Sequence, residues 1–379
     1  MKLSKIQYIE HEGMANEWQL NEVEFSDINL IVGKNASGKS RILAIISNTA
    51  HAMSGKGSMY DNGNVHFSFI HEDHSYIYKV NQNESKVVSE TLFIDSVKKL
   101  GRDHAGLGSL FSDEVGDHLK FQADADKYAL SSKGDDIQNP YLSPLVEWCK
   151  NLRYLVFSSE LGRSTVFVDS PNNNQPIDYS VHDPRVSTMI SGILIYGLKT
   201  WPETFRKAVI KDMRSVNFNI SDVGTVPSTR IKGSVPSPIY EVYVVEGAEG
   251  SQKILQFEIS TGMFRALATI INLQYVIHLQ KDKSAFLIDD IGEGLDFQRS
   301  KSLINLVIKH AVEQKLQIIM TTNDENIMNG VPLKYWSIIQ RDSHKVKIFN
   351  YKNSSKIFDE FQFMGINNFD FFAEKIYEG

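Results

Sequence analysis

The first part of the chain shows apolar patterns that predict strands, a turn and a helix. Strands are expected over residues 3–10, 18–25 and 28–32. A glycine-rich turn follows over residues 33–38, and the apolar positions of residues 39–53 recur at helical spacing. Three period-two segments, at residues 65–70, 75–80 and 86–94, then predict an antiparallel meander.

The middle of the chain has a weaker pattern. Residues 97–140 are polar and rich in glycine, so an irregular insertion is expected there. Helices are expected at residues 144–151, 185–198 and 202–213, with a strand at residues 154–157. Turn-forming residues predict loops over residues 170–176 and 221–238, and a strand should follow at residues 240–245.

The final third alternates between helical and strand-like segments. Helices are expected at residues 262–280 and 297–313, and strands at residues 285–289, 317–321, 335–340 and 346–351. Helices between apolar strands imply a buried parallel sheet, so the predicted fold class is α/β with a mixed or parallel core.

Composition narrows the class of protein. The chain has 379 residues, 42% of them hydrophobic and 23% charged, which excludes global disorder. Its net charge of −6 excludes a uniformly basic nucleic-acid coat but leaves room for a local basic groove. The single cysteine, Cys149, fits a reducing cytoplasm. The longest charge-free apolar stretches, residues 186–198 and 266–280, are shorter than the ~18–20 residues of a membrane span. We therefore expect a cytoplasmic protein without a membrane partner.

One motif carries specific chemistry. The pattern G-x-x-x-x-G-K-[ST] is matched in full by Gly33, Lys34, Asn35, Ala36, Ser37, Gly38, Lys39 and Ser40, and Arg41 follows it. The motif lies between an apolar strand and a helix, where glycines let backbone N–H groups converge on phosphate oxygens. Lys39 is expected to contact the β- and γ-phosphates, and the Ser40 hydroxyl to bind Mg²⁺. The sequence thus predicts a P-loop that binds ATP.

A second segment fits the other half of such a site. The apolar strand that begins at Ala285 ends in two carboxylates, Asp289 and Asp290, the layout of a Walker B strand. Asp289 is expected to hold Mg²⁺ through water, and Asp290 to orient the attacking water. Taken alone, the pair would also fit an acidic cap on the following helix.

Two further motifs flank that strand. Ser260 and Gly262 open the helix that precedes it, and a Gly-Leu-Asp sequence follows it at the spacing of a D-loop. By itself, the Ser-x-Gly sequence would be an ordinary helix N-cap. In this order, with Arg265 completing S-x-G-x-x-R, the motifs resemble those of an ABC-type ATPase head. More narrowly, they resemble the soluble group that holds SMC proteins, RecF and the OLD-like ATPases of bacterial antiphage systems.

The resemblance implies a division of the chain and a mechanism. The head would comprise residues 1–95 and 240–352, with an inserted helical lobe at residues 96–239 and an aromatic segment at residues 353–379. Two heads would dimerise, so that the P-loop of one copy and Ser260 with Gly262 of the other hold the same ATP. Arg265 would contact phosphate or stabilise its own helix.

Several positions depart from the family pattern. The usual catalytic Glu is replaced by Asp290, with Glu293 as a substitute, and the usual switch His by Asn323. These replacements predict a slow ATPase. No Q-loop glutamine can be placed, and Gln82 is expected to be a turn residue.

The surroundings of the head leave the biological role open. The 28 residues after Tyr351 (379 minus 351) are too few for an appended nuclease, so we expect a separate effector, a nuclease or toxin. The aromatic segment would pack on the head or dock a partner. Three basic clusters would be solvated faces or a DNA-facing groove: Lys98, Lys99 and Arg102; Arg206, Lys207, Lys211 and Arg214; Lys281 and Lys283. The leading interpretation is an antiphage regulator, and the alternatives are a RecF-like DNA-repair ATPase and a non-hydrolysing nucleotide-gated scaffold.

Overall fold

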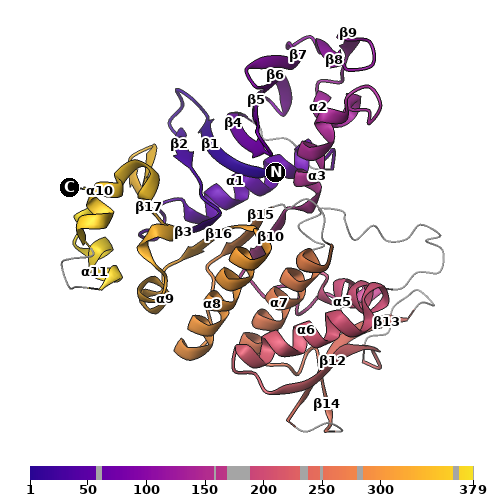
Figure 1. Cartoon of the computed structure of the whole chain (residues 1–379), viewed down its shortest axis with the longest axis vertical. Helices are drawn as coiled ribbons and strands as arrows, with labels where there is room; N and C mark the ends of the chain where they lie inside the picture. Colours follow the sequence, from indigo (N-terminus) through magenta and orange to yellow (C-terminus); the bar gives the residue numbers. More distant parts are fainter. Residues whose placement is uncertain are drawn as a thin grey trace.

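The chain folds around one large mixed sheet and one small antiparallel sheet (Figure 1). The structure is a computed structural model. It describes residues 1–56, 62–157, 159–168, 188–230, 238–247, 251–279, 285–361 and 367–378. Among these residues the large sheet has fourteen strands, in the order β10-β15-β16-β3-β17-β18-β2-β1-β4-β5-β6-β7-β8-β9.

One half of the large sheet is parallel. Its strands are β10 (Arg153–Val156), β15 (Ala285–Asp289), β16 (Gln317–Thr322), β3 (Ile28–Val32) and β17 (Trp336–Asp342). Because parallel strands end at the same edge of a sheet, the residues that follow β3, β15 and β16 gather there. The expected parallel core is confirmed.

The other half is mainly antiparallel. It contains β18 (Lys345–Asn350), β2 (Trp18–Glu24), β1 (Lys2–Glu10), β4 (Asn62–His71), β5 (His74–Asn83) and β6 (Lys86–Ile94). The meander over β4, β5 and β6 is confirmed. It continues through β7 (Val97–Arg102), β8 (Leu107–Ser112) and β9 (Asp117–Gln122).

The irregular insertion expected at residues 97–140 is therefore wrong over its first half. Residues 97–122 extend the large sheet and do not belong to the lobe that was expected over residues 96–239. The sequence did not indicate β9 because the strand is almost entirely exposed and shows no apolar alternation. After it come α2 (Ala129–Lys133), η1 (Pro140–Leu142) and α3 (Ser143–Asn151).

The large sheet separates two hydrophobic cores. In β3, Leu30 and Val32 join one core and Ile31 the other, as the alternation of a strand requires. Helix α1 (Lys39–Met53) packs on the Ile31 side. Helices α7 (Thr261–Leu279) and α8 (Phe297–Gln314) cover the opposite face.

The inserted lobe is mixed, not helical as expected. It contains α5 (Ile190–Thr200), α6 (Pro202–Ser215), β11 (Phe167–Val168), β12 (Ile220–Pro227), β13 (Ile239–Glu246) and β14 (Lys253–Leu255). The loop expected from residue 221 is a strand up to Pro227. This strand contains Gly224, where any other residue would clash with the paired strand. A side-chain carbon there would lie only 2.7 Å from the hydroxyl of Tyr243. The loop expected at residues 170–176 and residues 231–237 lie outside the described residues.

Short helices precede β17 and follow β18. They are α9 (Glu325–Gly330), η2 (Leu333–Tyr335), α10 (Tyr351–Phe361), α11 (Asn368–Ala373) and η3 (Ile376–Glu378). In Figure 1, α10 and α11 lie beside β17. Phe358, Phe361 and Phe371 are at most 3% exposed, so these rings of the aromatic segment pack on the head. None of the helices in the described ranges has the length and apolar character needed to cross a membrane.

Candidate nucleotide-binding site

The P-loop joins the buried strand β3 to helix α1 at the edge where the parallel strands end. Gly38 caps α1 with φ of +109°, a backbone conformation that side chains other than glycine rarely adopt. Its carbonyl oxygen accepts the first helical hydrogen bond, from the Ile42 N–H at 3.0 Å. The amides that begin α1 therefore point out of the helix end, as anion binding requires.

Lys39 lies within the loop and contacts its backbone. Its side chain is buried, and Nζ donates to the carbonyl oxygens of Gly33 at 2.9 Å and Lys34 at 3.1 Å. Burial lowers the pKa of Lys39, while Asp290 and Asp289 act in the opposite direction. A phosphate in the loop would give this ammonium an anionic partner.

Asp289, at the end of β15, contacts side chains from helix α1 and from β16. The Ser40 hydroxyl donates to Asp289 Oδ1 at 3.0 Å, and the Thr321 hydroxyl donates to the same oxygen at 2.5 Å. Mg²⁺ prefers hard oxygen ligands and usually keeps several waters in its coordination shell. The Ser40 hydroxyl as a ligand, with Asp289 beside it to hold a metal-bound water, therefore fits a Mg²⁺ site.

Asp290 lies one residue beyond, in a constrained position. Its φ is +53°, and its amide donates to the Thr321 hydroxyl at 2.8 Å. Burial raises the pKa of Asp290, and the carboxylates of Asp289 and Glu293 raise it further, whereas Lys39 lowers it. A raised carboxyl pKa suits a group that accepts a proton.

The other two proposed catalytic positions are exposed. Glu293 donates its amide to the Asp290 carbonyl oxygen at 3.2 Å. Asn323 follows β16, and among the described residues no hydrogen bond holds its side chain. Asp324 is occupied as the N-cap of α9, where it accepts from the amides of Asn326 and Ile327.

The predicted signature begins helix α7. Ser260 is exposed, and its hydroxyl accepts from the Met263 amide at 3.3 Å. Gly262 lies against the D-loop: a side-chain carbon there would be 3.1 Å from the Gly294 carbonyl oxygen and from Leu295. Within the described residues, no hydrogen bond joins Ser260 or Gly262 to the P-loop of the same chain.

Arg265 fastens α7 to its surroundings. Its Nη1 donates to the Glu293 carbonyl oxygen at 2.8 Å, and its Nε to the Ser159 carbonyl oxygen at 3.2 Å. With these two hydrogen bonds, Arg265 stabilises the position of its own helix within one chain, one of the two roles expected for it. The preceding residue, Ser158, lies outside the described part of the structure.

Sequence reasoning missed two side chains that shape the site. Thr321 ends an expected strand, but nothing in the sequence marks its hydroxyl as the partner of Asp289. Gln256 is fully buried, and its Nε2 donates to the carbonyl oxygens of Arg163 and Thr165 at 2.8 Å. Gln256 thereby holds the segment before Ser260. A lone glutamine outside any motif gives no such signal.

Gln82 is not a turn residue. It is 1% exposed within β5, and its Nε2 donates to the Tyr128 hydroxyl. The expectation failed because Gln82 pairs with Val87 across the meander and points into the core.

The basic clusters are largely engaged in internal contacts. Arg102 is buried, and its Nη1 donates to the Lys127 carbonyl oxygen at 2.6 Å. Lys99 Nζ lies 3.6 Å from the centre of the Phe111 ring. Arg206 pairs with Asp222 at 3.0 Å. Lys281 and Lys283 fall outside the described ranges. Because Arg102, Lys99 and Arg206 have partners within the chain, the two described clusters present less positive charge for DNA than their sequence implies.

Comparison with known proteins places the fold. No family model and no curated protein sequence matches the chain. A crystal structure of an SMC head bound to the C-terminal winged-helix domain of ScpA matches it with a TM-score of 0.50 and 14% identity, over 92% of this chain and 97% of that one. The fold is similar to that of an SMC head. A Pyrococcus furiosus Smc head with an extended coiled coil, bound to the C-terminal domain of ScpA, gives a TM-score of 0.48 and 14% identity, over 95% and 99% of the two chains.

The similarity to the SMC head agrees with the large mixed sheet and its covering helices. The chain has an α/β architecture similar to that of the SMC head. At 14% identity the similarity concerns the fold, so the roles of individual residues rest on the geometry described above.

Proposed function

We propose that the chain is a Mg²⁺-dependent ABC-type ATPase whose P-loop binds ATP. The observation that carries the proposal is the contact of Ser40 with Asp289, from the P-loop helix and the neighbouring carboxylate strand. Bound there, Mg²⁺ would neutralise charge on the phosphates. Lys39 and the first amides of α1 hold the phosphate chain, and Asp290 accepts a proton from the attacking water.

The site is completed by a second copy. Ser260 and Gly262 open a 19-residue helix whose first amides form an anion site, and Ser260 is exposed. In the proposed dimer this helix end meets the γ-phosphate held by the partner's P-loop. ATP thus joins two copies, and hydrolysis releases them.

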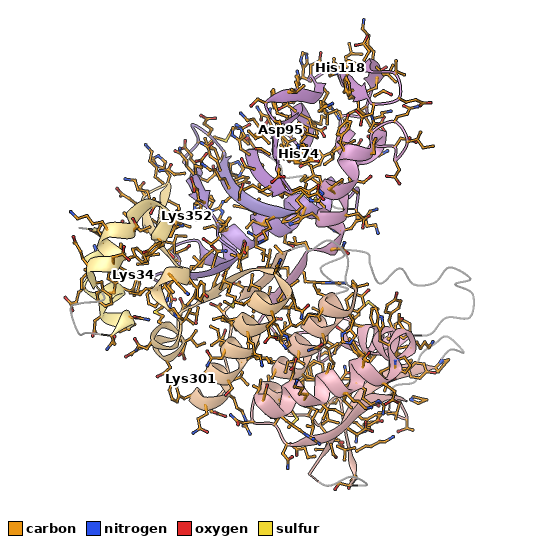
Figure 2. The ribbon with its side chains drawn as sticks, viewed as in Figure 1. Lys34, His74, Asp95, His118, Lys301 and Lys352 are labelled. Atoms are coloured by element: carbon orange, nitrogen blue, oxygen red, sulfur yellow. The ribbon has the colours of Figure 1, made fainter. Side chains whose placement is uncertain are left out.

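ATP binding and turnover test the proposal. We expect purified protein to bind ATP with Mg²⁺ and to release phosphate at less than about one per second, because Asp290 is short and Asn323 carries no proton. Lys39→Ala should lose both activities. The matched control is Lys301→Ala, which removes an exposed lysine of α8 that is not part of the P-loop (labelled in Figure 2). Wild-type protein that does not bind ATP, or turns over tens of molecules per second, contradicts the proposal.

A non-hydrolysing scaffold is the second candidate. It is favoured by Asn323, which is exposed at the end of β16 and cannot shuttle a proton. In that case ATP assembles two copies without phosphate release, and Asp290→Asn leaves assembly and nucleotide content unchanged. If the wild-type protein releases phosphate and Asp290→Asn abolishes that release, the chain is an ATPase and not a scaffold.

We further propose that the ATPase regulates a separate effector in bacterial antiphage defence. The support is the motif order shared with OLD-like ATPases. A nuclease or toxin gene beside this one, whose product co-purifies with the chain only in ATP, is the expected result. The alternative, a RecF-like ATPase, predicts ATP-dependent DNA binding that weakens steeply with salt.

A further inference from the structure

A groove of about 620 Å³ lies at the edge where the central parallel strands begin. Its lining includes Ile28, the first residue of β3, and Gln317, the first residue of β16. The P-loop follows the last residue of β3, and Asp289 is the last residue of β15. Because these strands are parallel, the groove and the candidate phosphate site lie at opposite edges of the same sheet.

The floor of the groove is held together by one buried side chain, that of Gln317, which is 1% exposed. Its Oε1 accepts from the Leu3 amide at 2.9 Å. Its Nε2 donates to the carbonyl oxygens of Leu3 at 2.7 Å and Ser26 at 3.2 Å. These hydrogen bonds join β16, β1 and the turn between β2 and β3. The groove is therefore preformed, which lowers the entropic cost of binding a partner.

Two aliphatic side chains from distant parts of the chain border the groove. Ile70, near the end of β4, is 53% exposed, and Val312, in the last turn of α8, is 61% exposed. Tyr335, which is partly buried, adds an aromatic ring to the same lining. Single exposed aliphatic residues are common on protein surfaces, but a pair that lines one concave site forms an apolar patch that a partner can bury.

The rim of the groove is positively charged. It carries three exposed lysines: Lys315, which caps α8, Lys334 of η2, and Lys352 of α10, which Figure 2 labels. Within the described part of the chain, none of these three lysines forms an ion pair. The fourth lysine of the lining, Lys2, pairs at 2.6 Å with Asp27, the only carboxylate among the described residues that line the groove. Four lysines and one aspartate give the lining a formal charge of +3, although the chain has a net charge of −6.

Charge and apolar surface together select the class of partner. Lysines complement carboxylates or phosphates, whereas Ile70 and Val312 complement apolar side chains. Nucleic acids contact proteins mainly through phosphate and sugar, so they would leave the aliphatic patch without a matching surface. A protein segment that combines acidic and apolar residues matches both the rim and the patch.

We propose that this groove binds an acidic segment of a partner protein. The apolar side chains of that segment lie between Ile70 and Val312, and its carboxylates pair with the three exposed lysines of the rim. The inference goes beyond the proposed function, because the groove lies at the edge of the sheet opposite the P-loop and its occupation requires no ATP.

Fluorescence anisotropy with a labelled peptide tests the inference. The probe is a short peptide that carries leucines at helical spacing among glutamates. Two matched peptides have glutamine in place of glutamate, or serine in place of leucine. We expect the wild-type chain to bind the probe, and each replacement to weaken binding about tenfold, because the groove uses both charge and apolar contact.

Variants of the chain locate the binding site. Lys334→Glu combined with Lys352→Glu, the rim variant, reverses two charges of the groove and should bind the probe about tenfold more weakly. The matched control combines Lys301→Glu with Lys347→Glu, at two exposed lysines that do not line the groove, and should bind as wild type does. Val312→Ser changes no charge and should also weaken binding, because it removes part of the apolar patch.

Several outcomes would overturn the inference. Wild-type protein that does not bind the probe, or binds the serine peptide as tightly, does not recognise an acidic apolar segment. Equal losses in the rim variant and its control place the binding elsewhere. Tighter binding of oligodeoxythymidylate that the rim variant abolishes would assign the groove to nucleic acid. Self-association of the free protein that the rim variant abolishes would assign it to a second copy. ATP binding that depends on Lys39 should be unchanged in the rim variant, so failure of this inference leaves the proposed function untouched.

Discussion

Ser40 and Asp289 are 249 positions apart in the chain, yet their side-chain oxygens lie 3.0 Å apart. Their contact requires β3 and β15 to end at the same edge, with β16 between them. The hydroxyl of Thr321, from the end of β16, donates to the same carboxylate oxygen. The fold thus brings the candidate metal ligand Ser40 and the carboxylate that would hold a metal-bound water together, and Thr321 fixes that carboxylate from a third strand.

Asp289→Asn removes the charge from this cluster while it keeps the volume. We expect ATP affinity in Mg²⁺ to fall about 10- to 100-fold, because the metal-bound water loses its anionic partner. Titration with and without EDTA measures the effect. EDTA should weaken binding to wild type and have little effect on the variant, so an equal response of both proteins would contradict the assignment.

Asp290 should impose a pH dependence on turnover. Its pKa is raised above the ordinary 3.8, and only the ionised form accepts a proton. The rate should therefore fall as pH is lowered, with an acid limb above that of an ordinary aspartate. Phosphate release between pH 4 and pH 8 tests this, and an unshifted limb near pH 4 would count against Asp290 as the base.

The same group should reduce stability at neutral pH. A carboxyl whose pKa is raised by folding contributes stability below the unfolded pKa, and this contribution is lost as pH rises through the folded pKa. Asp290→Asn removes the unfavourable charge, so its melting temperature at pH 7 should exceed that of wild type by about 2 °C. The difference should shrink as pH falls and vanish below the ordinary aspartate pKa of 3.8. An Asn variant that melts lower at pH 7 would refute the argument.

The proposed dimer, with ATP held between two copies, predicts complementation between inactive variants. Lys39→Ala damages the P-loop half of a site, and Ser260→Arg the opposite half. Neither variant should hydrolyse ATP alone. An equal mixture should recover about a quarter of wild-type activity, because half of randomly formed dimers are mixed and each carries one intact site. A mixture as inactive as its components would show that Ser260 does not serve the partner's site.

Arg265 should affect stability more than phosphate binding. Arg265→Ala loses hydrogen bonds to two carbonyl oxygens, each worth about 1 kcal/mol. Denaturant unfolding should report a loss of about 2 kcal/mol with little change in ATP affinity of the monomer. Unchanged stability combined with lost ATP-dependent dimerisation would assign Arg265 to the phosphate instead.

A substitution of Arg102 distinguishes two roles for its basic cluster, a DNA-binding groove and packing within the chain. It lies 3.9 Å from the buried Glu90, so Arg102→Met should destabilise the fold by about 3–5 kcal/mol. Glu90→Gln combined with Arg102→Met should recover part of that loss. An Arg102→Met variant that is fully stable but binds DNA more weakly would support the DNA-facing groove.

The sequence allowed the parallel core to be predicted because strands such as β3 and β15 are mainly apolar and are followed by glycine or carboxylates. Ile28–Val32 and Ala285–Asp289 are buried at every position. The same reasoning failed at β9, whose residues are mostly exposed, and at β12, where Gly224 accommodates Tyr243. Contacts such as that of Thr321 with Asp289 depend on strand order, which local periodicity does not encode.

The segment between Asp289 and Leu295 has a mechanical consequence. At its start it carries the carboxylate that contacts Ser40, and at its end it packs against Gly262, which the proposed dimer would place against a second copy. In that dimer, six peptide bonds would connect the phosphate site with the subunit boundary. Strain created by bond cleavage would reach that boundary without passing through the lobe, so that cutting ATP and parting the two copies become one event.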